Sequence, residues 1–259
     1  MGCTRSPFSG GVQCCAFCTG PVNPDVIPPQ ETVLPRQICV LCGLRKSTRT
    51  GDHLPPQCIY PPPRKPNLEL HKVPACEICN NAGANHDEEF KVVLSFLTGE
   101  YRDNPEAIIS SLGKTIGSNN RLANQVFSTQ QRGYAERGSG ILEPVTKLTF
   151  REESYNSVIQ RIVRGMYWRE TAKIMKQDAT VTVWPARLLD RSAAENLRDL
   201  LFLSPPKLFN DDTFAYRVFF NDDGYSIWGL QFFGKHIVFA GATTGSNADN
   251  PAEPNAPVG

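Results

Sequence analysis

The sequence lacks an apolar run long enough to span a bilayer, and its first residues carry no secretory signal. We therefore expect a cytoplasmic protein with no membrane partner, whose cysteines stay reduced. The sequence also lacks a charge imbalance, because 27 basic and 26 acidic side chains leave a formal net charge of +1. Such a chain has no global basic field, so any contact with nucleic acid must come from local basic patches. There are no internal repeats, which argues against a repeat architecture.

What is present is a chain of 259 residues with the composition of a globular protein, 20% charged and 40% hydrophobic. Its length allows one large domain or two modest domains. Nine cysteines are many for a reduced chain, and metal binding is the simplest account of at least four of them.

Four of these cysteines form two Cys-x-x-Cys pairs, Cys39 with Cys42 and Cys76 with Cys79. A pair on a tight turn directs both sulfurs to one point, and two pairs supply the four thiolates of a closed, structural zinc site. Such a site would staple a short, proline-rich segment that cannot bury a core of its own. The alternative is two disulfides, which would require an oxidising compartment.

The residues beside the pairs are not those that a structural zinc site requires. Asp52-His53 precedes a Leu-Pro-Pro sequence and is expected to end a strand, where adjacent side chains point to opposite faces. Asn80 follows the last cysteine and is expected in the first turn of a helix, close to the hairpin. One carboxylate and one amide oxygen suit a hard divalent ion such as Mg²⁺, and His53 beside that ion could take a proton from water.

This arrangement resembles the HNH, or ββα-metal, endonucleases built on a treble-clef zinc scaffold. The resemblance implies that Asp52 and Asn80 hold the catalytic ion, that His53 is the general base, and that Asn67 fixes the hairpin loop and the orientation of the histidine. Most members have His at the position of Asn80, whereas endonuclease VII-type phage resolvases have Asn there. The resemblance implies a metal-dependent endonuclease with DNA as its expected substrate, and it permits a bacterial or phage setting.

Five basic residues surround the Asp52-His53 dipeptide in the sequence and could hold phosphates, although a solvated loop would have the same composition. They are Arg45, Lys46, Arg49, Arg64 and Lys65. Cys14, Cys15 and Cys18 could form a second zinc site with Cys3 or Cys58, but no second pair follows at a suitable spacing, so surface thiols are the simpler interpretation.

The whole chain is predicted to be α+β, with the zinc ββα-metal module followed by helices and a C-terminal antiparallel sheet. The predicted boundaries are an irregular lead 1–36, the module 37–98, an α+β accessory domain 99–240 and a disordered tail 241–259. After a break at 81–84, a helix capped by Asn85 or Asp87 is expected to run to Leu97. Hydrophobic periodicity predicts further helices, and alternation or a high content of aromatic and β-branched residues predicts further strands. They are helical segments within 104–137, helices 152–175 and 193–201, and strands 145–150, 180–184, 214–220, 226–233 and 237–240.

Polar residues from His86 to Glu89 crowd the start of the helix predicted after this break, as extra metal ligands or as acidic residues favoured at a helix N-terminus. His71 is expected to be a surface residue and His236 a structural one. Besides the endonuclease, two functions remain open. They are a zinc-stapled nucleic-acid-binding module without turnover, and a protein-interaction module. The sequence gives no indication of the oligomeric state.

Overall fold

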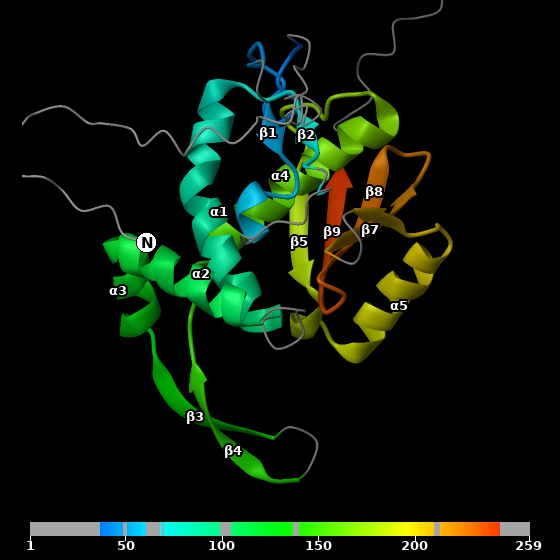
Figure 1. The fold of residues 1–259 in the computed structure, drawn as a ribbon. Helices are drawn as coiled ribbons and strands as arrows, with labels where there is room; N and C mark the ends of the chain where they lie inside the picture. Colours follow the sequence, from blue (N-terminus) through cyan, green and yellow to red (C-terminus); the bar gives the residue numbers. More distant parts are fainter. Residues whose placement is uncertain are drawn as a thin grey trace, which may run out of the picture. The chain divides into compact units, whose positions relative to one another are not determined.

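The computed structural model describes residues 37–48, 51–60, 68, 70–98, 105–136, 140–209 and 213–243. Figure 1 shows the arrangement of its helices and strands, which confirms a mixed α+β fold. The N-terminal elements are β1 (Asp52–His53), a 3₁₀ turn η1 (Gln57–Ile59), β2 (Lys72–Val73), α1 (Glu77–Thr98), α2 (Pro105–Ser118) and α3 (Asn120–Ser128). The later elements are β3 (Gln131–Glu136), β4 (Leu142–Lys147), α4 (Glu152–Thr171), β5 (Val181–Pro185), η3 (Ala186–Leu188), α5 (Arg191–Phe202), β6 (Lys207–Phe209), β7 (Phe214–Phe220), β8 (Tyr225–Phe232) and β9 (His236–Thr243).

The C-terminal half is a five-stranded antiparallel sheet in the order β5-β9-β8-β7-β6. Alternate side chains of β8 point to opposite faces. Trp228, Leu230 and Phe232 belong to the core that α4 covers, whereas Ile227 packs with Leu201 of α5 on the other face. The predictions of β7, β8 and β9 are confirmed in type and position, and β6 is an edge strand that the sequence did not indicate.

Helix α4 joins the sheet to the N-terminal elements. Its apolar stripe is fully buried in a cluster that contains Cys39, Leu54 and Phe90 as well as the sheet residues. A Cβ atom added at Gly165 would clash with Leu54, so the helix approaches the end of β1 very closely. The hydrophobic core is therefore continuous across the predicted boundary between 98 and 99.

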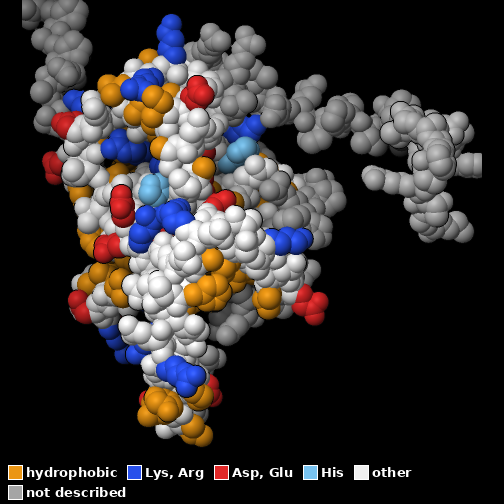
Figure 2. Space-filling model, turned by 90° about the vertical axis from the view of Figure 1, so that its left-hand side faces the viewer, with side chains coloured by type: hydrophobic (Ala, Val, Ile, Leu, Met, Phe, Trp, Pro, Cys, Tyr) orange, Lys and Arg blue, Asp and Glu red, His pale blue; other side chains and the backbone are white. Residues whose placement is uncertain are grey.

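The structure corrects two predictions. Helix α1 runs without a break through 81–84, because burial of Gly83, Phe90 and Leu94 outweighs the weak helix propensity of asparagine and glycine there. The segment 131–136, expected within a helical region, is strand β3, whose backbone pairs with β4 in an antiparallel hairpin. Figure 2 shows hydrophobic side chains at the tip of this hairpin, where Tyr134, Ile141 and Leu142 are exposed.

Within the described residues, no helix is long and apolar enough to cross a bilayer. The predicted irregular lead 1–36 lies outside the described residues, as does the tail beyond 243, whereas 241–243 belong to β9.

Candidate functional site

The four predicted cysteine ligands come together. The first pair lies on a tight loop in which the Gly43 N–H donates to the Cys39 carbonyl at 2.8 Å, and Gly43 adopts a φ of 68° that favours glycine. The second pair lies at the start of α1. All four Sγ atoms lie within 4.8 Å of one another, and those of Cys42 and Cys76 are 4.0 Å apart.

This cluster can hold a structural Zn²⁺ ion. All five described cysteines are free thiols, so no disulfide competes for the sulfurs. Burial raises the pKa of Cys39, and burial together with the neighbouring sulfurs raises the pKa of Cys79. Burial also acts on Cys42, but backbone hydrogen bonds from Leu44 and Arg45 lower its pKa to about 7. A divalent cation would offset the repulsion among crowded thiolates, which is the chemistry of a tetrathiolate zinc site.

Helix α4 places a cation near the same sulfurs. The Arg164 guanidinium donates to the Ala179 carbonyl at 2.7 Å. Burial lowers the pKa of Arg164, and the sulfurs of Cys42 and Cys79 act in the opposite direction. Because arginine stays protonated in proteins, Arg164 is a cation that can offset part of the negative charge of a zinc–thiolate centre.

The β1–β2 hairpin is tied to the cysteine cluster through the backbone. Asp52 is opposite Val73 and His53 is opposite Lys72 in the antiparallel register. The segment after β2 then pairs with the first cysteine loop, since Val40 N–H donates to the Pro74 carbonyl at 2.9 Å. Asp52 is buried and His53 is partly exposed, as expected for adjacent residues of one strand.

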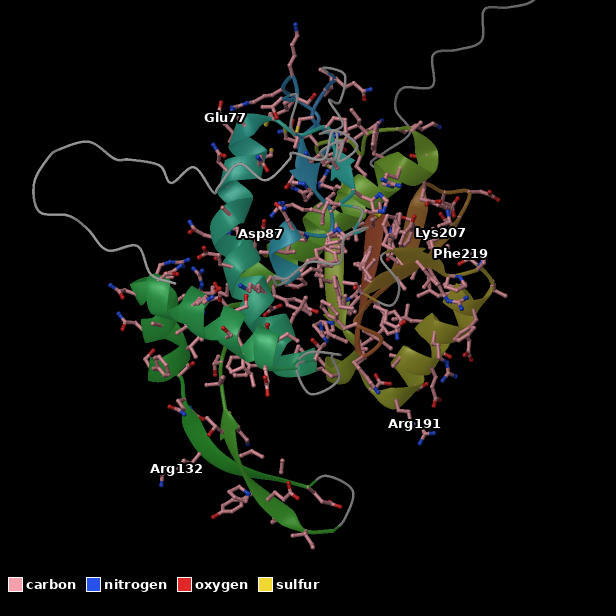
Figure 3. All side chains as sticks on the ribbon, in the orientation of Figure 1. Glu77, Asp87, Arg132, Arg191, Lys207 and Phe219 are labelled. Carbon is pink, nitrogen blue, oxygen red and sulfur yellow. The ribbon has the colours of Figure 1, made fainter. Side chains whose placement is uncertain are left out.

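Asp52 forms an ion pair with Arg161 of α4. Its Oδ2 accepts a hydrogen bond from Nη2 of Arg161 in α4 at 2.5 Å, and Nη1 of the same guanidinium donates to Oδ1 of Asp87 in α1 at 2.6 Å. Burial opposes the charge of Arg161, but the two carboxylates raise its pKa above the ordinary value. Burial raises the pKa of Asp87, against the lowering effect of Arg161. Figure 3 labels Asp87 midway along α1, well beyond Glu77 at its start.

The remaining predicted residues are placed as follows. Asn80 is partly exposed in the first turn of α1, where its backbone N–H donates to the Cys76 carbonyl at 3.0 Å. Arg45 and Lys46 are exposed on the first cysteine loop. Four predicted site residues lie outside the described residues, so the structure does not test them. They are Asn67, Arg49, Arg64 and Lys65.

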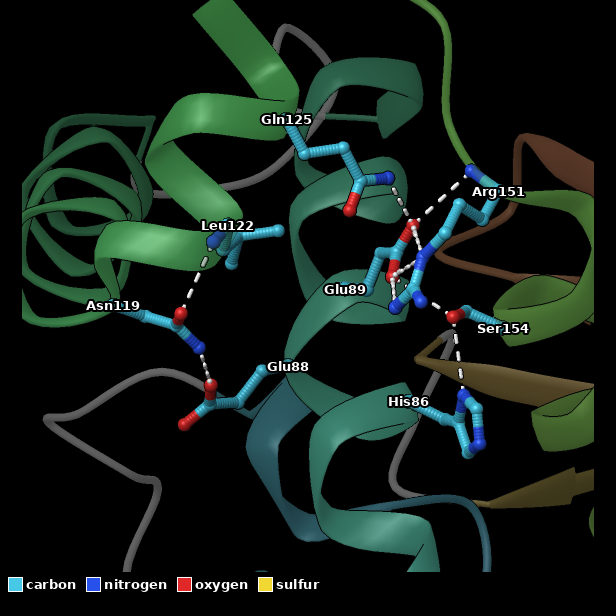
Figure 4. A network of polar contacts seen from close by, with 8 residues as sticks. All are labelled: His86, Glu88, Glu89, Asn119, Leu122, Gln125, Arg151 and Ser154. Carbon is cyan, nitrogen blue, oxygen red and sulfur yellow. Dashed lines mark hydrogen bonds and ion pairs between the residues drawn. The ribbon is translucent and has the colours of Figure 1, made fainter.

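The interpretation of His86 to Glu89 as helix N-terminal residues is wrong, because α1 begins about two turns earlier. Each of the four contacts a residue outside α1 instead: Asp87 contacts Arg161, and Figure 4 shows the contacts of the other three. His86 Nδ1 lies 3.0 Å from the Ser154 hydroxyl, and Glu88 accepts from Asn119 at 2.7 Å. Among the described residues, the cysteines are the only set of three or more potential metal ligands with converging atoms.

Three further residues, His71, His236 and Cys58, have packing or hydrogen-bonding contacts. His71 is partly exposed and contacts Phe209 edge-on, with ring centroids 4.1 Å apart. His236 is buried with its Nε2 2.5 Å from the Tyr155 hydroxyl, and burial lowers its pKa to about 4. The Cys58 thiol donates to the Asp87 carbonyl at 3.1 Å, and burial raises its pKa to about 12.

Sequence reasoning missed Arg161 as a partner of Asp52, since 109 residues separate them. The available signal was its position at the edge of the apolar stripe of α4, between Val158 and Ile162, where a charged side chain requires a partner.

Comparison of the chain with protein-family models, with curated proteins and with solved structures found no match. No relative therefore assigns a role to any residue.

Proposed function

We propose that the chain is a metal-dependent endonuclease of the HNH type, which hydrolyses phosphodiester bonds in nucleic acid, with DNA as the first candidate. One observation carries the proposal. The strand with Asp52 and His53 and the helix turn with Asn80 are both anchored to the same four-cysteine cluster. That is the connectivity that a treble-clef ββα-metal site requires.

Asp52 and Asn80 would hold the catalytic divalent ion. Because Oδ2 of Asp52 accepts from Arg161, Oδ1 is the oxygen left for the ion, and the amide oxygen of Asn80 is a neutral second donor. Mg²⁺ fits such a sparse set, since it keeps most of its waters and takes the remaining ligands from substrate phosphate. When bound, the ion would stabilise the charge that develops on the phosphate and on the leaving oxygen.

The protein side chains would perform the remaining steps. His53 takes a proton from the attacking water, for which its partly exposed position gives access to solvent. Arg45 and Lys46, both exposed beside the cysteine cluster, hold the flanking phosphates together with Arg49, Arg64 and Lys65.

A second candidate function is a zinc-stapled module that binds nucleic acid or a protein without turnover. One observation favours it: Asp52 already has a buried cationic partner in Arg161, and this leaves the carboxylate with less charge to offer an ion.

A plasmid-nicking assay with Mg²⁺ or Mn²⁺ tests the proposal. We expect His53→Ala to lower the nicking rate about 10²- to 10⁴-fold, which is the usual contribution of a general base. His71→Ala, which changes a histidine next to β2, is the matched control and should keep the wild-type rate. Zinc content and circular dichroism of both variants must match the wild type.

The outcomes separate the candidates. If the wild type and His53→Ala are equally inert but retain DNA or RNA, the binding module replaces the nuclease. If neither DNA nor RNA is bound, the protein-interaction module replaces the nuclease.

A further inference from the structure

We infer that Arg161 is a positioning residue of the Asp52 site. Its guanidinium fixes the orientation of the Asp52 carboxylate and weakens the binding of the catalytic ion, so a residue of helix α4, outside the zinc module, tunes the site. This inference rests on the proposed function, because it assumes that Asp52 is an ion ligand.

The first support is the geometry of the guanidinium. Arg161 joins three elements, since Nη2 binds Asp52 on β1, Nη1 binds Asp87 on α1, and the residue itself belongs to α4. Only 11% of its side chain is exposed, and the Asp52 side chain is 6% exposed. A short, buried, charge-assisted contact of this kind holds a carboxylate in one orientation.

The second support is the space made for this side chain. A Cβ atom at Gly83 would clash with the guanidinium of Arg161, so the absence of a side chain in α1 lets the guanidinium lie against the helix. The Arg161 Nε is buried and has no hydrogen-bond partner among the residues that the structure describes. The two carboxylates alone therefore satisfy the polar end of Arg161, and they determine where it lies.

The third support is the charge count. Two carboxylates face one guanidinium, so the cluster carries a net charge of about −1 when all three groups are ionised. A divalent ion at Oδ1 of Asp52 would be attracted by this surplus and repelled by the neighbouring guanidinium. Arg161 therefore reduces ion affinity while it holds the ligand oxygen in place, and these two effects can be measured separately.

Hydrogen-bonded partners of metal ligands contribute about 10- to 100-fold to affinity or activity in metal sites generally. We therefore expect Arg161→Met to lower the nicking turnover about 10- to 100-fold. The same change removes a positive charge beside the ligand, so the Kd for Mn²⁺ should fall by about tenfold or more. A merely structural arginine would not tighten ion binding when it is removed.

The experiment uses the full-length, zinc-loaded protein and two readouts. Mn²⁺ binding is titrated by electron paramagnetic resonance, and nicking turnover is measured at saturating Mn²⁺. Arg151→Met is the matched control, because it also breaks an arginine contact to a buried carboxylate of α1, that of Glu89, at 2.5 Å. It should lower stability and leave both the Mn²⁺ Kd and the turnover unchanged.

Arg161→Lys separates the effect of the positive charge from the effect on the orientation of the Asp52 carboxylate. It is also the variant to use if Arg161→Met does not fold. A single ammonium keeps the positive charge but cannot bridge two carboxylates with a planar fork. We expect its Mn²⁺ Kd to stay near the wild-type value while turnover falls at least about tenfold. Wild-type turnover in this variant would overturn the inference.

Failure of the inference differs from failure of the proposed function. If the wild type nicks DNA and Arg161→Met matches it in Mn²⁺ Kd and turnover, the inference fails and the nuclease stands. If the wild type nicks nothing with either ion, the proposed function fails, and Mn²⁺ titration alone decides the role of Arg161. An unchanged or weaker Kd in Arg161→Met then rejects that role.

Discussion

Helix α1 contributes one acidic residue to each of two polar clusters, and these clusters differ in how completely their charges are satisfied. Glu89, 1% exposed, accepts hydrogen bonds from the Arg151 backbone and guanidinium, from Gln125 at 2.5 Å and from Ser154 at 2.8 Å. One carboxylate faces one guanidinium, and neutral donors fill the remaining acceptor sites (Figure 4). Such a cluster has no unmet charge and stabilises the packing of α1 against α3 and α4.

The Asp52 cluster is unbalanced. Two carboxylates share the single guanidinium of Arg161, whose Nε has no partner within the described part of the chain. The two clusters therefore differ in how much negative charge they can offer a ligand. The satisfied one has nothing to offer a ligand, whereas the unbalanced one retains negative charge beside a hairpin that the cysteines hold in place.

The largest expected effect comes from breaking the cysteine cluster. Cys79→Ala, like Cys39→Ala, should abolish zinc binding and unfold the hairpin that carries Asp52, since structural zinc supplies much of the folding free energy of such segments. The Glu89 cluster should survive, because its partners come from α3 and α4. Zinc analysis checks metal loss, and amide exchange at 52–54 in the hairpin and at 120–128 in α3, which contributes Gln125 to the Glu89 cluster, checks this difference. Equal loss of protection in both segments would show that the clusters are not independent.

A matched pair of neutralising changes comes next. Glu89→Gln should lower the free energy of unfolding by about 2 kcal/mol, because donors buried around the carboxylate lose a charged acceptor. Asp52→Asn should cost about 1 kcal/mol, because Arg161 keeps Asp87 as its partner. Only Asp52→Asn should weaken Mn²⁺ binding, and neither should release zinc. Urea unfolding and Mn²⁺ titration separate the two clusters, and weaker Mn²⁺ binding in Glu89→Gln would contradict the assignment.

Glu89 and Asp87 should also contribute to acid stability with opposite sign. Although burial favours the neutral acid, hydrogen bonds from Arg151 and its neighbours lower the pKa of Glu89, so its stabilising contribution is lost as the pH falls below the range in which glutamate titrates in the unfolded chain. Burial raises the pKa of Asp87, so its folded form binds a proton more readily, and its contribution improves as the pH falls through that raised value.

Measurement of the free energy of unfolding at several acidic pH values tests these two opposite pH dependences. Glu89→Gln should flatten the acid loss of stability, and Asp87→Asn should steepen it. The same slope in both variants would show that the clusters are electrostatically alike.

Local patterns predicted much of this molecule. Strands β7, β8 and β9 are rich in aromatic and β-branched residues, and α4 carries a long apolar stripe, so local composition and helical periodicity predict their types. The cysteine cluster follows from two short spacings, which constrain the loops directly. The coarse fold and the candidate zinc site could be predicted from the sequence for this reason.

Contacts between residues far apart in the sequence could not be predicted. The contact of Asp52 with Arg161 depends on how α4 packs against the hairpin, which no local pattern encodes. The same limit explains β3, whose extended conformation depends on a partner strand, and the unbroken α1, in which tertiary burial outweighs local propensity. The nuclease assignment itself stays a prediction.

The smallest expected effect is the most specific to the unbalanced cluster. Gly113 in α2 is exposed, and an added Cβ would meet no atom within 4 Å, so Gly113→Ala should stabilise the protein by up to about 1 kcal/mol through helix propensity. Gly83→Ala offers the same gain in α1, but its methyl group would clash with the guanidinium of Arg161. The arginine would have to leave its two carboxylates, so the gain should disappear and Mn²⁺ binding should tighten as in Arg161→Met. Thermal unfolding and Mn²⁺ titration of both alanine variants make the test. If Gly83→Ala is as stabilising as Gly113→Ala and binds Mn²⁺ like the wild type, Arg161 is not held between the carboxylates, and the contrast between the two clusters is lost.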